Sequence, residues 1–444
     1  MSIILLLLAV IFIVVSTTRF NFHPFLSLLF AAIFYGLLAG MPFADVIMSI
    51  KEGFGGTLGN IGILIIAGTI IGVFLEKSGG AFALAEKVLN AIGDKHVPTA
   101  MSIIGYIVAI PVFSDSGFVI LTPLNRALTK KAGLSLASTA VALGLGLSVA
   151  HAIVPPTPGP IAAAGILNAD LGLVISMAIP VSLFALFFGW LWATRFASKV
   201  YIDPNPELSE EELESRTKNA PGAGKSLLPI LLPLILIVLK SIAELPTTPM
   251  GEGTFVSIIT FLGEPIIALL IGVIIAFTLP AKFESKMLSS TGWVGKGLMD
   301  AAIIIMITGA GGAFGKVLQN SGIADVIGQS LGEANLGIWL PFILAAGIKS
   351  AQGSSTVALI TTASIVAPLM PSLGLETDTA RALGVLVIGA GSLVVSHAND
   401  SFFWVFTQMT DMKVKDGYFL HTTGTLILGT ASAFAVWIIS LFIL

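Results

Sequence analysis

Long apolar runs recur from one end of this chain to the other, and they constrain its fold more than any other feature. Crossing about 30 Å of hydrocarbon takes about 20 residues of α-helix, at a rise of about 1.5 Å per residue. Of the 444 residues, 55% are hydrophobic and 11% are charged, whereas about 25% of a soluble domain is charged. The sequence therefore predicts an all-α polytopic protein that lies in the lipid bilayer.

The composition also argues against several classes of function. The net charge is −3 and there is no basic tract, so neither nucleic acid nor an anionic lipid surface is expected as a partner. The chain has no cysteine, which excludes disulfides, thiolate catalysis and thiolate metal sites. The glycine-rich stretches 53–56 and 309–315 follow no strand and carry no phosphate-binding Lys-Ser/Thr pair, so nucleotide binding is not expected either. No cofactor or metal is predicted.

The apolar stretches divide into two sets separated by one hydrophilic segment. Residues 194–225 carry both signs of charge and predict a cytoplasmic linker. The linker leaves residues 1–193 and 226–444 as two halves, each with five candidate spans. The ten predicted spans are 3–18, 24–40, 61–75, 134–153, 165–193, 226–243, 254–279, 299–317, 381–400 and 420–442.

The two halves resemble each other in short motifs. Three pairs match in pattern and order: 73–79 with 316–322, 116–121 with 354–359, and 147–152 with 393–398. Weak internal symmetry of this kind is typical of transporter folds. Because five spans per half is an odd number, the second half must enter the membrane upside down. The sequence therefore predicts an inverted repeat.

Each half also contains an apolar segment with a polar interruption in its middle. The arms of 99–129 and of 338–370 are too short to cross the bilayer, and they flank the polar tips 113–117 and 352–355. We therefore predict two re-entrant hairpins. Cations border the first hairpin and acids the second, so the positive-inside rule places their entrances on opposite sides, cytoplasmic and external respectively. These border residues are Lys95, Arg126, Lys130 and Lys131, and Glu333, Glu376 and Asp378.

Backbone groups at such tips are tolerated only where protein or a water-filled cavity satisfies them, so the tips should line a site. Polar breaks at 154–160 and 397–401 are expected to meet them at the repeat interface. Helix N-termini near Phe118 and Thr356 then present positive dipole ends, which suits a carboxylate. The same side chains could instead only cap helices. The predicted substrate-binding residues are Ser114, Asp115, Ser116, Thr157, Gln352, Gly353, Ser354, Ser355, Thr356 and Asn399.

Proton coupling needs a titratable group that is exposed alternately to the two sides of the membrane. Asp115 is the first candidate, because an acid between two apolar half-helices is expensive to bury and is functional by default. His151, His397 and Asp400 are the reserves. Lys349, one turn before the second tip, could snorkel, pair with an acid or attract the substrate. Sodium coupling stays open, since the hairpin serines and carbonyls could build an oxygen cage.

Taken together, these features resemble the gluconate permease family, within a wider ion-transporter superfamily. The resemblance implies proton symport of a small anionic sugar acid across the bacterial inner membrane. It also implies a homodimeric scaffold and a mobile transport domain that holds both hairpins, an elevator-type arrangement. The matching motifs are Phe-His-Pro-Phe-Leu at 22–26, Gly-Gly-Thr-Leu-Gly at 55–59, Val-Pro-Pro at 154–156 with Pro-Gly-Pro at 158–160, Gly-Gly-Ala-Phe at 311–314, Gly-Ser-Ser-Thr-Val-Ala at 353–358 and Ser-His-Ala-Asn-Asp at 396–400.

The first tip departs from the family pattern. Gluconate carriers have a glutamate before Gly-Phe-Val, whereas this chain has Asp115 followed by Ser116, and Thr157 stands where those carriers often place histidine. Gluconate is the leading substrate, and glycerate, another aldonate or D-serine stays open. A channel is less favoured because polarity is concentrated at four breaks and not along a continuous pore. No enzyme is expected, since no nucleophile with a paired base and no metal-ligand set is present.

Overall fold

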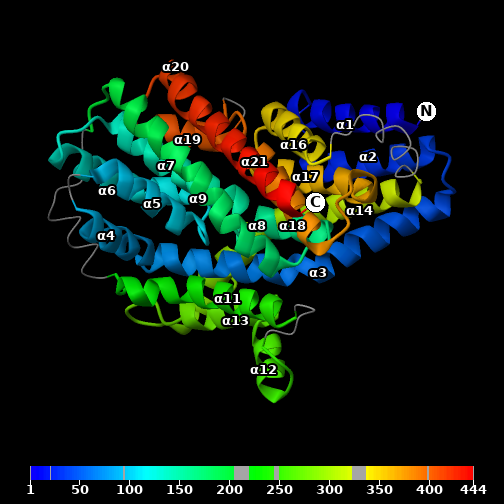
Figure 1. Ribbon diagram of the computed structural model, residues 1–444, viewed down its shortest axis with the longest axis horizontal. Coiled ribbons are helices and arrows are strands. Elements are labelled where there is room, and N and C mark those ends of the chain that lie inside the picture. Colours follow the sequence, from blue (N-terminus) through cyan, green and yellow to red (C-terminus); the bar gives the residue numbers. More distant parts are fainter. Residues whose placement is uncertain are drawn as a thin grey trace.

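The computed structural model describes residues 2–20, 22–93, 96–204, 220–244, 250–322, 337–397 and 400–443. All regular structure within these ranges is helical, and none of these residues lies in a strand. Five of the described helices are long and apolar enough to cross a membrane, or seven if each of two bent helix pairs is one span. Figure 1 shows how the helices pack into one elongated body, from which α12 protrudes.

The helices follow the apolar runs of the sequence, and most boundaries differ from the predicted ones by several residues, whereas α3 begins at Phe43, well before the predicted start at 61. In the residues up to 204 they are α1 (Ser2–Thr18), α2 (Pro24–Leu38), α3 (Phe43–Lys77), α4 (Gly80–Ile92), α5 (Val97–Ala109), α6 (Ser114–Lys131), α7 (Leu136–Ile153), α8 (Pro158–Ile166), α9 (Leu171–Arg195) and η2 (Ala197–Lys199). From residue 220 onward they are α11 (Ala223–Ala243), α12 (Thr254–Leu262), α13 (Pro265–Ala276), η3 (Ser285–Leu288), α14 (Trp293–Asn320), α16 (Trp339–Gln352), α17 (Ser355–Val366), η4 (Ala367–Leu369), η5 (Pro371–Leu373), α18 (Asp378–Leu393), α19 (Ser401–Met409), α20 (Val414–Gly417), the π-helical turn η6 (Tyr418–Thr422) and α21 (Thr423–Ile443). Residues 205–219, in the middle of the predicted linker, lie outside the described residues.

Glycines of the stretches 53–56 and 309–315 let two helices pack closely. A Cβ atom on Gly53 of α3 would lie 2.4 Å from the carbonyl oxygen of Gly312 in α14, and one on Gly312 would lie 2.0 Å from Thr57 Oγ1. The two backbones therefore touch where only glycine fits, which is how small residues bring membrane helices together. Further along, Thr69 Oγ1 donates a hydrogen bond of 3.0 Å to the Gly297 carbonyl. These contacts join α3 and α14 into one pair.

Two helices form the centre of the molecule and end at the breaks that the sequence predicted. Nearly every residue of α7 and of α18 is buried, as expected for helices that are apolar on all sides. The helix α7 ends before the proline-rich segment 154–157, and α18 ends before the extended segment 394–397, in which Val395 has a φ of +57°. A β-branched residue rarely adopts that backbone conformation. Unusual backbone thus follows both central helices.

Two predicted spans are divided in the structure. The run 254–279 forms α12 and α13, which are bent by 67°, because Pro265 cannot donate a backbone hydrogen bond and disfavours helix in the residue before it. The run 165–193 crosses the end of α8 and the start of α9. There, Asp170 accepts a 2.7 Å hydrogen bond from the Leu173 amide and caps α9. The prediction of one continuous helix was therefore wrong for 254–279, whereas the run 165–193 contains the span α9, which begins later than predicted.

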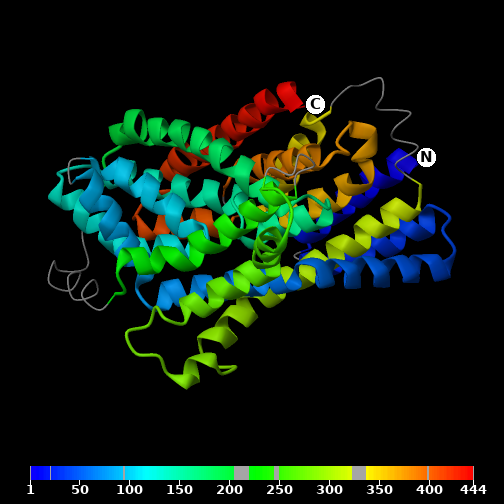
Figure 2. The same cartoon turned by 60° about the horizontal axis from the view of Figure 1, so that its bottom comes forward.

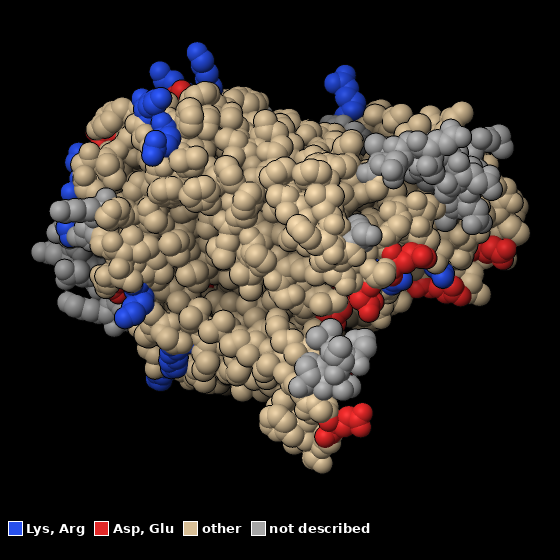
Figure 3. Space-filling view, viewed as in Figure 1, with Lys and Arg blue, Asp and Glu red and all other residues tan. Residues whose placement is uncertain are grey.

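Charge is distributed unevenly along the long axis of the molecule. In both ribbon views, α4, α5 and α6 lie toward one end and α1 and α2 toward the other (Figures 1 and 2). On the face drawn in Figure 3, most Lys and Arg side chains gather at the α4–α6 end and along the upper edge, and most Asp and Glu side chains lie toward the opposite end. The broad tan surface between them carries few charged side chains, which suits contact with lipid because charged groups are costly to place in hydrocarbon.

Candidate functional site

A cavity of about 460 Å³ lies where the helix breaks meet. Its polar lining comes from the start of α6, the end of α7, the α16–α17 turn and the α18–α19 segment. Its apolar lining includes Ile303, Ile304 and Ile307 of α14. Hydroxyl groups dominate the polar lining: Ser114, Ser148, Ser354, Ser355, Thr356, Ser396, Ser401 and Thr425. Such a cavity, which combines apolar residues with converging polar groups, is typical of a small-molecule site.

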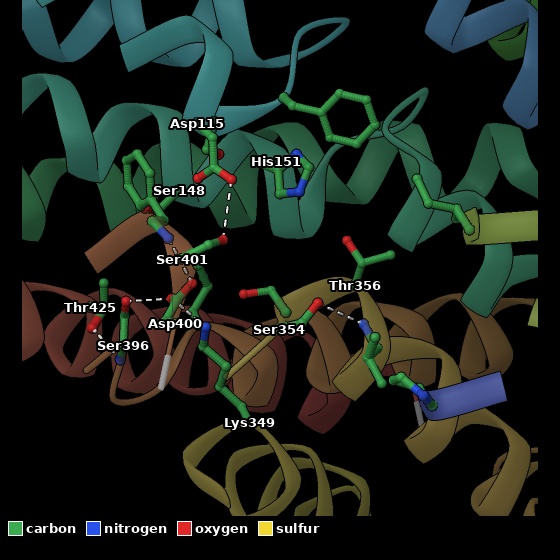
Figure 4. Close-up of a pocket in the computed structure, with 18 of the residues that line it drawn as sticks. Asp115, Ser148, His151, Lys349, Ser354, Thr356, Ser396, Asp400, Ser401 and Thr425 are labelled. Atoms are coloured by element: carbon green, nitrogen blue, oxygen red, sulfur yellow. Dashed lines mark hydrogen bonds and ion pairs between the residues drawn. The ribbon is translucent and has the colours of Figure 1, made fainter. Parts of the chain in front are cut away.

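The strongest interaction in this cavity is an ion pair between two segments far apart in sequence. Lys349 Nζ lies 2.6 Å from Asp400 Oδ2, and the two side chains are 2% and 10% exposed. Lys349 also donates to the carbonyl oxygen of Gly353, at the α16–α17 turn. The buried ammonium is therefore held by one carboxylate and one backbone oxygen, both at helix breaks. Figure 4 shows Lys349 beside Asp400.

Asp400 is held by more than its ion pair. Its Oδ1 accepts a 3.0 Å hydrogen bond from the Phe402 amide and so caps the N-terminus of α19, and its Oδ2 also accepts from the Ser396 hydroxyl. Behind Ser396 lies His421, whose Nε2 is 3.2 Å from the serine Oγ. The imidazole is fully buried and stacks on Phe406 with a centroid distance of 4.6 Å. A series of polar contacts thus runs from Lys349 through Asp400 and Ser396 to His421.

Several helices begin at this cavity. The helix α6 starts at Ser114 and α17 at Ser355, whose first turn is capped by Ser354 through a 3.3 Å hydrogen bond from the Val357 amide. Gly353 makes the preceding turn with a φ of +93°, which favours glycine. Helix N-termini attract anions through free N–H groups and the helix dipole. Together with Lys349, they make this part of the cavity suited to a carboxylate.

Asp115 faces this arrangement from the other side. Its Oδ2 accepts a 3.2 Å hydrogen bond from Ser401 Oγ, across the cavity between α6 and α19. Figure 4 shows Asp115 and His151 pointing into the cavity from one side and Lys349 and Asp400 from the other. The described residues contain no group of three or more His, Asp or Glu that could hold a metal ion.

Comparison with known proteins assigns the chain to a family. The family model described as GntP family permease matches residues 1–442. The chain belongs to the GntP permease family. It is 36% identical to a gluconate permease of Pseudomonas aeruginosa, over 98% of this chain and 96% of that protein. It is also 33% identical to the high-affinity gluconate transporter of Escherichia coli, over 93% of each chain, and 32% identical to the D-serine transporter DsdX of the same species, over 99% and 98% of the two chains.

The fold of this GntP permease is shared with a solved transporter. The crystal structure of the Alcanivorax borkumensis YdaH transporter superposes with a TM-score of 0.66, covering 95% of this chain and 99% of that one at 15% identity. The resemblance to gluconate permeases that the motifs indicated is therefore confirmed, as are the prediction of an all-α membrane transporter and the prediction that the protein is not an enzyme.

The structure brings most of the predicted site residues together. The cavity is lined by Ser114, Asp115, Ser354, Ser355 and Thr356 of the predicted substrate site, and by His151 and Asp400 of the predicted proton-coupling groups. Asn399 and the side chain of Gln352 lie outside the described residues. Substrate contacts and proton coupling of this GntP permease stay predictions.

Four predicted residues do not line this cavity. Thr157 is buried in the α7–α8 break and donates a 2.6 Å hydrogen bond to the Val154 carbonyl. His397 contacts the Ser350 carbonyl at 2.8 Å, so the matched histidines of the two halves have different surroundings. Gly353 contributes its carbonyl oxygen to Lys349, and Ser116 follows Asp115 within the first turn of α6.

Sequence reasoning missed other polar groups of the site. Ser148, Ser396, Ser401 and Thr425 line the cavity without having been singled out. Serine and threonine are common inside membrane helices, where they bond to the preceding turn, so their presence carries little signal. His421 gave one hint, since a histidine at the start of an apolar run is unusual. Its neighbour Ser396 lies 25 residues away, and no pattern in the sequence linked the two.

Proposed function

We propose that this permease takes up gluconate or a related small hydroxy carboxylate together with protons. The observation that carries the proposal is the cavity that combines Lys349 and helix N-termini with a row of hydroxyl groups. The cation and the N-termini suit a carboxylate, and the serines and threonines suit the hydroxyl groups of a sugar acid. The named relatives support this class of substrate, because gluconate and D-serine each carry a carboxylate and at least one hydroxyl.

The coupling proton is proposed to reside on a titratable group of the same cavity. Asp115, His151 and Asp400 line it and would be reached from whichever side the cavity opens to. A proton on a carboxylate in this site removes a charge that would otherwise cross the bilayer with the substrate. Sodium remains the alternative, with the oxygen atoms of the tips as ligands.

The architecture proposed for transport is an inverted repeat of 1–193 and 226–444, joined by the linker 194–225, in a homodimer of the bacterial inner membrane. The α5–α6 and α16–α17 pairs are the two re-entrant hairpins, and the closely packed α3 and α14 belong to the scaffold. The shared fold with a solved transporter and the uneven charge in Figure 3 support this arrangement.

The test is uptake of radiolabelled gluconate into proteoliposomes. We expect saturable accumulation against a gradient when the inside is more alkaline than the outside, with sodium and potassium buffers giving equal rates. Competition by glycerate, other aldonates and D-serine ranks the substrates. Uptake that collapses without sodium would replace the proton as the coupling ion, and non-saturable equilibration would indicate a channel.

A further inference from the structure

Lys349 is the cation of the cavity, yet it is already neutralised. No other Lys or Arg occurs among the described residues that line the cavity, and the Lys349 ammonium is paired with Asp400 at 2.6 Å. An arriving carboxylate therefore meets an ion pair and not a free positive charge. To bind at Lys349, it must compete with Asp400.

The geometry permits such an exchange. An ammonium has three N–H donors, and the contacts of Lys349 are Gly353 O and Asp400 Oδ2. Lys349 also lines the cavity, so a ligand can approach it without unfolding either helix. Asp400 keeps two further donors, the Ser396 hydroxyl and the Phe402 amide, so its position does not depend on Lys349 alone.

We propose that Lys349 changes partner during transport: the carboxylate of the substrate displaces Asp400 from the ammonium, and Asp400 takes up one proton from hydronium that reaches the cavity from the solution. One O–H bond of hydronium breaks and leaves water, one O–H bond forms on Asp400, and Lys349 stays an ammonium. This inference rests on the proposed function. It assigns the carboxylate of the substrate to Lys349 and the coupling proton to Asp400, the two residues of one ion pair.

The charge count supports the exchange. Lys349 and Asp400 sum to zero when the cavity is empty, and a bound carboxylate would leave an uncompensated negative charge inside the protein, which is costly. One proton on Asp400 returns the net charge of Lys349, Asp400 and the bound carboxylate to zero. Three other titratable groups lie near Asp400: Asp115 on α6, His151 on α7 and His421 on η6. None of them has an ion pair with Lys349 in the structure, so the exchange applies to Asp400.

The exchange predicts opposite effects for the two partners, measured by calorimetric titration of purified protein with gluconate and with its neutral amide, gluconamide. Asp400→Asn removes the competitor, so gluconate should bind about tenfold tighter with little dependence on pH. Lys349→Gln should weaken gluconate about tenfold or more, the fold-change of a charge-assisted hydrogen bond. Gluconamide should respond to neither change.

Two further variants keep the test decisive. The double variant Lys349→Gln/Asp400→Asn retains hydrogen-bonding groups without buried charge, and it should bind gluconate no better than gluconamide even if a single variant is unstable. Removing an exposed pair of similar length, Glu284 and Lys286 at 2.7 Å, by Glu284→Gln/Lys286→Gln should change nothing.

The outcomes separate this inference from the function on which it rests. Weaker gluconate binding in Asp400→Asn, or a preference for gluconate over gluconamide in the double variant, overturns the exchange. Absence of saturable binding of any hydroxy carboxylate to the wild-type protein overturns the proposed function instead.

Discussion

A single hydroxyl at the start of α17 tests whether the cavity binds substrate. Thr356 lines the cavity, and Thr356→Val keeps the shape of the side chain but removes its hydroxyl. We expect gluconate affinity to fall about tenfold, because a hydrogen bond to a charged group contributes about 1.5–3 kcal/mol, with no loss of thermal stability. Thr361→Val on the same helix is the matched control, since Thr361 Oγ1 is buried without a hydrogen-bond partner. Equal affinities in the two variants would remove Thr356 from the site.

At the residue scale, the site residues that could be predicted from the sequence are polar residues within apolar surroundings. Asp115 and Ser354 stand out because each interrupts an apolar run, and both line the cavity. The partner of Lys349 could not be predicted, because pairing with Asp400 depends on how segments 51 residues apart meet in space. Snorkelling and substrate attraction were equally consistent with a lysine near a tip.

At the scale of elements, the crossing of α3 and α14 gives a stability prediction. Gly312→Val would place a side chain 2.0 Å from Thr57 Oγ1 and 2.7 Å from the Gly53 carbonyl. Because both contacts lie within helices, the pair must separate, and we expect a loss of about 1–3 kcal/mol or more, typical of overpacking. Gly55→Ala on α3 is the control, because its Cβ would meet nothing within 4 Å. Melting temperatures followed by size-exclusion chromatography compare the two.

Hydropathy predicted that membrane helices are present, but it did not predict how long they are or where they bend. The 35-residue α3 follows a path of about 52 Å and is bent by 43° between Asn60 and Gly62. The predicted span covered only 61–75, because the polar and glycine-rich start of this helix does not resemble a membrane segment. The bend between α12 and α13 could have been predicted from Pro265. The π-helical turn that carries His421 could not, since no residue pattern specifies it.

For the whole molecule, the absence of cysteine makes the insertion topology directly testable. Single cysteines at Lys130, at the end of α6, and at Glu376, between η5 and α18, should react with a membrane-impermeant maleimide from opposite sides, the first only from the cytoplasm. The expectation follows from the positive-inside rule applied to the two helix pairs. Reaction of both residues from one side would contradict the inverted repeat. The cysteine-free parent is the control for background labelling.

The three isoleucines of α14 that line the cavity bear on how freely the rest of the lining can move past this helix. Ile303, Ile304 and Ile307 offer a bound ligand only methyl and methylene contacts, which have no preferred direction. If the polar residues of the cavity were to travel along α14 together with a bound ligand, no hydrogen bond between the ligand and these three side chains would need to break. Ile307→Ser would add a hydroxyl group that can hydrogen-bond to the ligand, and this bond would oppose the movement.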